Sequence, residues 1–147
     1  MNMKNLTISQ ATIDDIEKLI EVDSTAFEKN WNFQMFSDEL KKDYAFYFIA
    51  EINNIPVGFA GIWCIYETAE LIRIATHSEY RKTGIGNSLI KTIISKATEK
   101  SCETMLLEVR SSNKAAQALY LKNEFSQIDI RKGYYDGEDA VIMQLMI

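Results

Sequence analysis

The chain has 147 residues, of which 47% are hydrophobic and 25% charged, values typical of one globular domain, here residues 1–147, with a sizeable core. Its net charge of −5 argues against nucleic acid as a partner, and one histidine with two cysteines at unsuitable spacing argues against a metal site. No stretch is apolar enough to span a membrane and no signal peptide is recognisable, so we expect a cytoplasmic protein with reduced thiols.

The first half of the chain predicts two helices placed between strands. A strand is expected near Leu6–Ser9, followed by a helix from about Ile13 with Thr12 as its N-cap and Asp15 at the capping-box position. The apolar positions of this helix are Ile13, Ile16, Leu19, Ile20 and Phe27. A second, short helix is expected over Phe33–Lys42. Two strands and the turn that joins them come next, in the order Ala45–Glu51, Asn53-Asn54, Val57–Ile65.

The second half of the chain predicts an alternation of strands and helices. In chain order these are the strand Leu71–Ala75, the helix Ile85–Ala97, the strand Thr104–Arg110, the helix Lys114–Asn123, and the strands Phe125–Arg131 and Asp139–Met146. The complete order predicts an α/β (α+β) fold, in which a mixed central sheet carries helices on both faces.

The most informative stretch, Leu71–Ala97, contains a polar loop with two close glycines between the strand and an amphipathic helix. Such a loop leaves several N–H groups at the helix N-terminus without partners, and with the helix dipole they form an anion site suited to a pyrophosphate. Gly84 and Gly86 let the backbone approach phosphates closely because no Cβ intervenes. Arg81 and Lys82 supply the positive charge that an anionic ligand needs.

Three kinds of phosphate-binding loop are compatible with glycines at this place. A P-loop requires GxxxxGK[ST], which is absent, and the dinucleotide fingerprint GxGxxG is incomplete because Leu89 occupies its last position. The remaining pattern, [RQ]-x-x-G-x-[GA], is filled by Arg81, Gly84 and Gly86 and resembles the acetyl-CoA pyrophosphate loop of the GNAT N-acetyltransferases. The alternative is an ordinary strand–loop–helix turn that uses glycines for its geometry.

A second informative stretch runs from Leu106 to Phe125. Glu108 lies within an apolar strand, where a carboxylate is costly unless it is paired or functional; the alternative is a side chain that reaches solvent or Arg110. Asn113 falls at or near the N-cap of the next helix, and Tyr120 lies two turns further along nearly the same face. That face offers an amide to a pantetheine arm and a phenol near its sulfur, unless Tyr120 is a core tyrosine.

Two segments, LLEVRSSNKAAQALY and IRKGYYDGEDAVIMQL, resemble the RimI-type ribosomal-protein-alanine N-acetyltransferases of the GNAT fold. The similarity covers essentially the whole chain and is sharpest from Ile74 to Met143. It implies that Glu108 is the general base and Tyr120 the general acid. It also implies acetyl-CoA contacts from Ile74, Ala75, Thr76, Arg81, Lys82, Thr83, Gly84, Ile85, Gly86, Asn87 and Asn113. The implied acceptor contacts are Trp31, Tyr134 and Tyr135.

Three positions depart from the pattern of that family. His77 stands where an aspartate is usual, and Asn87 stands where an arginine is frequent. Arg73 replaces a neutral residue in the strand that would contact the cofactor, so it bears on which peptides fit.

Amine acetylation requires a neutral amine, so the fraction of amine that is already neutral decides how strong a general base the enzyme needs. About a tenth of α-amines, with a pKa near 8, is neutral at pH 7, whereas the neutral form of a lysine side chain is hundreds of times scarcer. Glu108, directly or through a water, would take the proton, Tyr120 would protonate the leaving thiolate, and a backbone N–H of Ile74–Thr76 would hold the oxyanion. No covalent intermediate is needed, so Cys64 and Cys102 are expected to be core thiols.

We therefore expect an N-alpha-acetyltransferase that uses acetyl-CoA and no metal, with the N-terminal alanine of a small-subunit ribosomal protein as acceptor. Trp31, Tyr134 and Tyr135 would form a narrow slot for the peptide, although packing roles explain them equally well. The alternatives are an enzyme for other N-termini, lysines or small amines, and a non-catalytic acyl-CoA-binding module. A pure binding module needs neither Glu108 nor Tyr120, which favours an enzyme.

Overall fold

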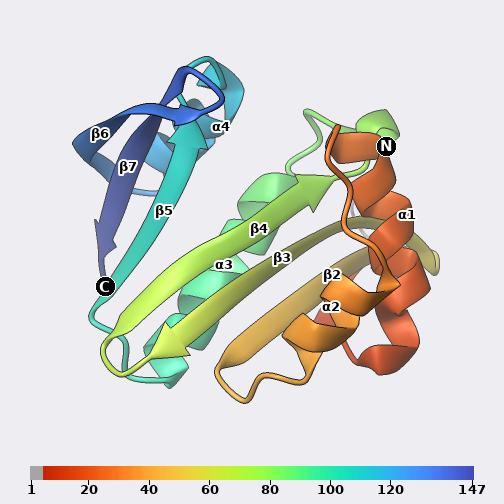
Figure 1. Ribbon diagram of the computed structural model, residues 1–147. Coiled ribbons are helices and arrows are strands. Elements are labelled where there is room, and N and C mark those ends of the chain that lie inside the picture. The colour runs from red at the N-terminus through yellow and green to blue at the C-terminus, as the bar shows by residue number, and fades with distance from the viewer. Residues whose placement is uncertain (1–4) are drawn as a thin grey trace.

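The computed structural model describes residues 5–147, which form a seven-stranded sheet in the order β1-β2-β3-β4-β5-β7-β6 (Figure 1). The strands are β1 Leu6–Gln10, β2 Ala45–Ile52, β3 Ile55–Ile65, β4 Thr68–Thr76, β5 Thr104–Arg110, β6 Ser126–Tyr135 and β7 Glu138–Met146. The helices are α1 Ile16–Ala26, α2 Phe33–Leu40, α3 Ile85–Glu99 and α4 Lys114–Lys122, with short 3₁₀ turns at Ile13–Asp15 and Ser78–Tyr80. The predicted mixed sheet with helices on both faces is confirmed.

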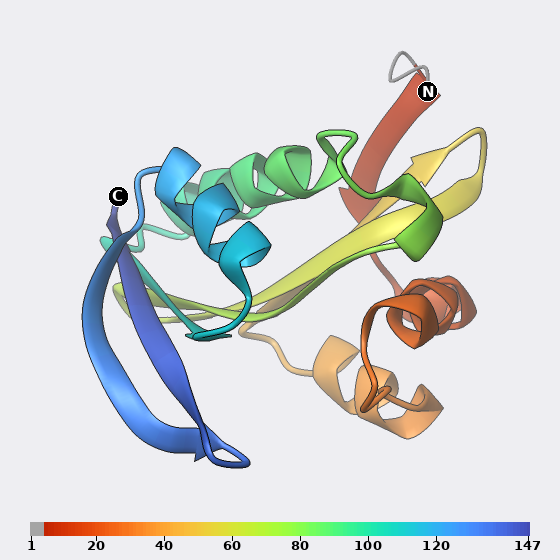
Figure 2. The same cartoon turned by 90° about the horizontal axis from the view of Figure 1, so that it is seen from above.

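The helices divide the core into two layers, one on each face of the sheet. Figure 2 shows α3 and α4 on one side and α1 and α2 on the other. The apolar stripe predicted for α3 is buried at Ile85, Leu89, Ile90, Ile93 and Ala97. These side chains pack on the inner strands, and each large one contributes about 1.5–3 kcal/mol by leaving water. No helix within residues 5–147 is long and apolar enough to cross a bilayer.

The sheet divides at its middle, between β4 and β5. These strands are parallel neighbours over three residue pairs, from Thr68 with Thr104 to Glu70 with Leu106. Beyond Glu70 they diverge, so that β5, β6 and β7 stand apart from the other four strands (Figure 1). The divergence leaves the second half of β4 with a free edge toward β5, and this edge positions the candidate site.

A β-bulge in β4 decides which side chains face each layer. Gly61 of β3 pairs with Arg73 and Ile62 pairs with Leu71, so Ile72 is the extra residue. Because an extra residue reverses the alternation of a strand, Leu71 packs toward α3 whereas Arg73, two positions on, contacts α1.

The sequence places most element ends within a few residues. The capping box is present, with the Thr12 N–H donating to Asp15 at 2.8 Å, but the helix opens with a 3₁₀ turn and becomes α-helical at Ile16. The expectation that Phe27 belongs to this helix is wrong, because its backbone is already extended at φ −131° and ψ 144°. The strand predicted over Phe125–Arg131 is longer, since pairing resumes at Tyr135 after an irregular stretch.

Candidate active site

The free edge of β4 contains the three strand residues predicted to contact the acetyl donor. Ile74, Ala75 and Thr76 lie beyond the last pair with β5, and within residues 5–147 their outward edge has no strand partner. An extended edge with free N–H and C=O groups accepts a chain that runs alongside it, as a pantetheine arm does.

The glycine loop leads into α3 at the end of β4. Gly84 is the N-cap of α3 in a left-handed conformation, with φ +90°, and no side chain caps this helix end. The N–H groups of the first turn therefore point into the loop without intrahelical partners. Thr83 turns inward and donates from its hydroxyl to the carbonyl of Tyr80, whereas Arg81 and Lys82 are exposed. This arrangement fits a pyrophosphate: free N–H donors, a helix dipole and two cations.

The two glycines of the loop meet different requirements. A Cβ added to Gly84 would meet no protein atom within 4 Å, so within the protein itself only the left-handed backbone requires glycine there. A Cβ added to Gly86 would lie 3.2 Å from Leu119 Cδ2, so Gly86 also allows α4 to approach α3.

Two asparagines predicted to contact the donor also hold α4 in place. Asn87 accepts a hydrogen bond at 2.9 Å from Asn123, at the C-terminal end of α4. Asn113 caps α4, with its side-chain oxygen accepting from the N–H of Ala116 at 3.1 Å, which leaves its NH₂ group as the donor available to a ligand.

Glu108 and Tyr120 reach the divergence of the strands from opposite faces. Leu107 and Val109 are buried in the layer of α3 and α4, so Glu108 between them faces the other way. The side chain of Glu108 is 27% exposed and pairs at 3.0 Å with Arg131 of β6. Arg110, named as a partner only in the alternative for Glu108, pairs instead with Glu138. Arg131 reaches Glu108 from β6, across the intervening β7.

Tyr135 is an electrostatic neighbour of both predicted catalytic residues. Burial raises the pKa of Tyr120 to about 12, and the neighbouring Tyr135 adds to this shift. Burial also raises the pKa of Tyr135, with the nearby Glu108 charge adding to the shift and Arg110 opposing it. The phenol of Tyr120 stays protonated throughout the physiological range and is available as a donor.

The structure adds a second carboxylate that sequence reasoning did not single out. Glu70 forms the last β4–β5 pair, opposite Leu106, at the point where the strands separate. Burial raises the pKa of Glu70, the Glu108 charge raises it further, and Arg131 opposes both. The available signal was an acid directly before the apolar run that begins at Leu71, a weaker signal than the carboxylate within an apolar strand that pointed to Glu108.

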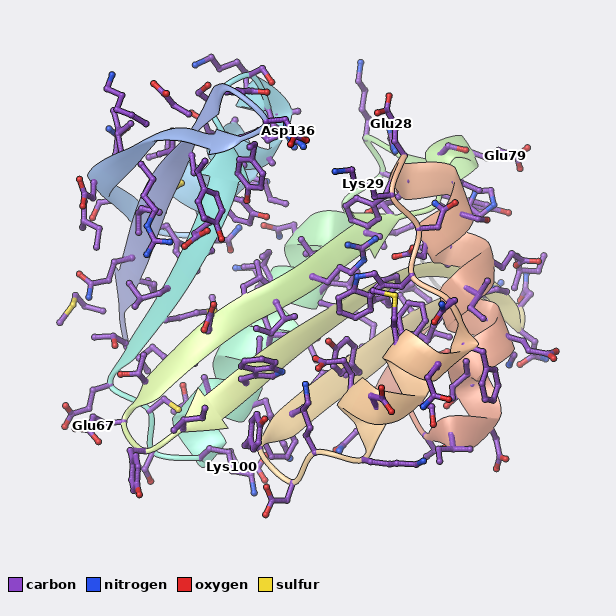
Figure 3. All side chains as sticks on the ribbon, in the orientation of Figure 1. Glu28, Lys29, Glu67, Glu79, Lys100 and Asp136 are labelled. Carbon is purple, nitrogen blue, oxygen red and sulfur yellow. The ribbon has the colours of Figure 1, made fainter. Side chains whose placement is uncertain are left out.

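The three aromatic residues predicted for the acceptor lie on two segments. Trp31 precedes α2 and packs edge-on against Phe36, with ring centroids 5.2 Å apart, which also agrees with a packing role. Tyr134 and Tyr135 pack edge-to-face at 5.0 Å at the end of β6. The two segments meet at an exposed ion pair between Lys29 and Asp136, 3.4 Å apart (Figure 3).

Cys102 is buried in the core, and Cys64 is half-buried and packs against the core. Burial, together with the neighbouring Cys102, raises the pKa of Cys64 to about 12, which keeps it in the poorly nucleophilic thiol form. Residues 5–147 contain no cluster of three or more His, Cys, Asp or Glu side chains able to hold a metal ion.

The fold and sequence of this chain are shared with known acetyltransferases. The crystal structure of the ribosomal-protein-S18-alanine N-acetyltransferase of Escherichia coli superimposes with a TM-score of 0.90, at 32% identity, over 97% of this chain and 94% of that one. The ribosomal protein bS18-alanine N-acetyltransferase of Haemophilus influenzae is 36% identical over 92% of this chain and 95% of its own length. An N-alpha-acetyltransferase of Saccharolobus solfataricus is 33% identical over 95% and 92%.

The family match covers the elements that build the site. Residues 16–125, from the start of α1 to just before β6, match the acetyltransferase (GNAT) family. The strand divergence and the glycine loop both lie within that range. The chain therefore belongs to the acetyltransferase (GNAT) family and is an acetyl-CoA-dependent N-acetyltransferase.

Proposed function

We propose that this enzyme is an N-alpha-acetyltransferase whose acceptor is the N-terminal alanine of a small-subunit ribosomal protein. The observation that carries this proposal is the similarity, at 32–36% identity over more than nine-tenths of the chain, to enzymes named for that reaction. A ribosomal acceptor would place the reaction in the cytoplasm.

The acetyl donor is held, in this proposal, by the loop and by β4. N–H groups of Gly84–Asn87 bind the pyrophosphate, helped by the charges of Arg81 and Lys82. The pantetheine arm runs along the free edge of Ile74–Thr76, with the Asn113 amide as a further donor. The thioester then lies where β4 and β5 diverge, between Glu108 and Tyr120.

The acceptor amine loses its proton to Glu108, directly or through a water. Glu108 pairs at 3.0 Å with Arg131, and its partial exposure gives the released proton a path to solvent. An α-amine is neutral in about a tenth of molecules at pH 7, so a weak base is sufficient.

Attack on the thioester carbonyl forms a tetrahedral intermediate whose oxygen carries negative charge. A backbone N–H of Ile74–Thr76 stabilises this oxygen. When the intermediate collapses, the sulfur leaves and Tyr120 donates a hydrogen bond and then a proton to the thiolate. The buried, protonated phenol of Tyr120 supports this role.

Peptide acetylation followed by mass spectrometry tests the proposal. A peptide that begins with alanine should release CoA thiol from acetyl-CoA and carry the new acetyl group on its α-amine. The matched control has the same sequence with a blocked N-terminus and one free lysine, and it should react far more slowly. Equal rates on the two peptides would favour a lysine acetyltransferase, and no thiol release with any amine would favour a non-catalytic module.

A further inference from the structure

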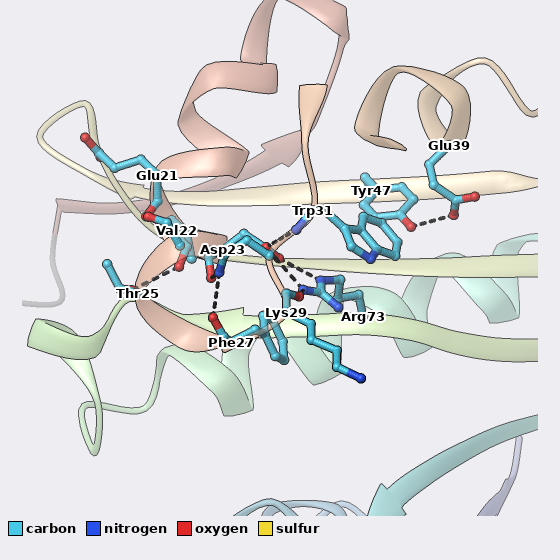
Figure 4. A network of polar contacts seen from close by, with 12 residues as sticks. Glu21, Val22, Asp23, Thr25, Phe27, Lys29, Trp31, Glu39, Tyr47 and Arg73 are labelled. Atoms are coloured by element: carbon cyan, nitrogen blue, oxygen red, sulfur yellow. Dashed lines mark hydrogen bonds and ion pairs between the residues drawn. The ribbon is translucent and has the colours of Figure 1, made fainter. Parts of the chain in front are cut away.

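Arg73 forms the centre of a buried polar cluster between β4 and α1. Its Nε lies 2.6 Å from one carboxylate oxygen of Asp23 and its Nη2 lies 3.1 Å from the other, a two-point contact (Figure 4). Asp23 is completely buried in α1, and its carboxylate also accepts from the N–H of Trp31 at 2.8 Å. The Asp23 carboxylate depends on this pair for its charge, because it has no access to water, whereas the Arg73 side chain is 14% exposed.

The segment between α1 and α2 closes around the same guanidinium. The ring of Phe27 lies 3.8 Å from the guanidinium carbon and the ring of Trp31 lies 4.6 Å from it. The carbonyl of Lys29 accepts from Nη2 at 3.1 Å. Residues at the start, middle and end of segment 27–31 thus all contact one side chain, which fixes the segment against the sheet.

The position of this cluster connects the two substrates. Arg73 immediately precedes Ile74–Thr76, the edge proposed to carry the acetyl donor. Segment 27–31 ends at Trp31, and its Lys29 reaches across to Asp136 on the β6–β7 turn. The segment that Arg73 fixes is therefore one wall of the proposed acceptor slot.

We propose, on the basis of the proposed function, that Arg73 is a positioning residue that sets the width of the acceptor slot by holding segment 27–31. A slot excludes a large first side chain only if its wall cannot move. Trp31 is held by the hydrogen bond from its N–H to Asp23 and by the contact of its ring with Arg73, and Arg73 also bonds the carbonyl of Lys29. These contacts keep the wall in place. Lysine cannot replace Arg73, because it lacks the planar fork that contacts both oxygens of Asp23 and stacks on two rings.

Two variants test the proposal with the full chain. Arg73→Lys keeps the charge and loses the fork. Asp23→Asn combined with Arg73→Met removes both charges, so no unpaired carboxylate remains to unfold the protein, while the amide introduced in α1 still offers an acceptor to the Trp31 N–H. The control is Lys18→Met, which breaks another ion pair between α1 and the sheet, Lys18 with Glu51 at 2.9 Å, on the β2 side of the helix.

Both variants should raise the KM for an alanine peptide about tenfold and reduce the preference for alanine over leucine at the first position. The dissociation constant of acetyl-CoA and kcat should stay within about threefold of wild type. A structural defect would instead lower the amount of active enzyme and leave the KM and the preference unchanged. Lys18→Met should have wild-type values throughout. Folded variants with a wild-type peptide KM and preference would overturn the proposal.

A second measurement needs no acceptor, so it separates this proposal from the proposed function. With Trp63→Phe as background, Trp31 is the only tryptophan, and acrylamide quenching reports its mobility. Quenching should increase in both Arg73 variants and not in Lys18→Met, and unchanged quenching would refute the positioning role. If wild type acetylates lysines or small amines rather than N-termini, the proposed function fails. In that case the same variants are compared by their KM for the amine that the wild-type enzyme acetylates, in place of their KM for the alanine peptide.

Discussion

Gly84 is proposed to have two roles: it adopts a left-handed backbone, and it lets phosphates approach the N-terminus of α3. Replacing Gly84 with valine should affect protein stability through the first role and acetyl-CoA affinity through the second. The left-handed backbone, with φ +90°, costs a residue with a Cβ about 1–2 kcal/mol. For a chain of this size that cost lowers Tm by roughly 2–8 °C, which leaves the fold intact. The valine Cβ causes no steric clash within the protein, because a Cβ added at Gly84 meets no protein atom within 4 Å.

The effect on acetyl-CoA binding should be larger than the effect on stability. A Cβ at the mouth of the loop keeps phosphates away from the N–H groups of the first turn of α3. Losing one hydrogen bond to a charged group costs about 1.5–3 kcal/mol, or roughly a 10- to 150-fold rise in the dissociation constant. Isothermal titration calorimetry with acetyl-CoA, combined with thermal unfolding of the free protein, measures both quantities.

Gly137 provides a matched control for the backbone term. It has φ +95°, an added Cβ would again meet no protein atom within 4 Å, and it lies in the β6–β7 turn away from the loop. Gly137→Val should lower Tm by a similar amount and leave the affinity for acetyl-CoA unchanged. If folded Gly84→Val binds acetyl-CoA as wild type does, the loop does not hold the pyrophosphate and the reasoning fails.

Three further variants test the chemistry and the acceptor slot. Tyr120→Phe keeps the ring and its packing, so acetyl-CoA affinity should hold while kcat falls about 10²- to 10⁴-fold in a thiol-release assay; near-normal turnover would make Tyr120 a packing residue. Glu108→Gln should lower the rate and leave it rising with pH as more amine becomes neutral, whereas wild type should level off; parallel pH profiles would remove Glu108 as the base. Asp136→Asn breaks the exposed pair with Lys29, so the peptide KM should change by at most about fivefold at low salt and converge with wild type near about 0.5 M salt; a salt-independent change would refute an electrostatic role.

Local patterns in the sequence were sufficient to predict the elements and the glycine loop. The capping box at Thr12 and the stripe of α3 are set by residues three or four apart, so their structure follows from the sequence alone. The turn at Asn53-Asn54 is likewise local, with positive φ at both residues.

Partners that are distant in the chain could not be predicted in the same way. From the sequence, Arg73 is only a departure from a family pattern. Its ion pair could not be predicted, because Asp23 is fifty positions away and a bulge at Ile72 decides which face of the sheet Arg73 takes. The pairing of Glu108 with Arg131 could not be predicted either, since Arg131 reaches Glu108 only through the register of a hairpin. In each case an isolated charge in an apolar pattern was visible, but its partner was set by tertiary structure.

The three residue pairs that join β4 to β5 have a consequence for how the molecule opens. Because only three residue pairs join the two halves of the sheet, we expect them to exchange amide hydrogens as two cooperative units. The protection of β5–β7 should then differ from that of β1–β3. Acetyl-CoA that bonds to β4 and also contacts α4 would connect the two halves of the sheet where β4 and β5 no longer pair. Acetyl-CoA should therefore slow exchange in β6 and β7, strands that contain none of the residues proposed to bind it, and bring the two units closer to a single unfolding transition.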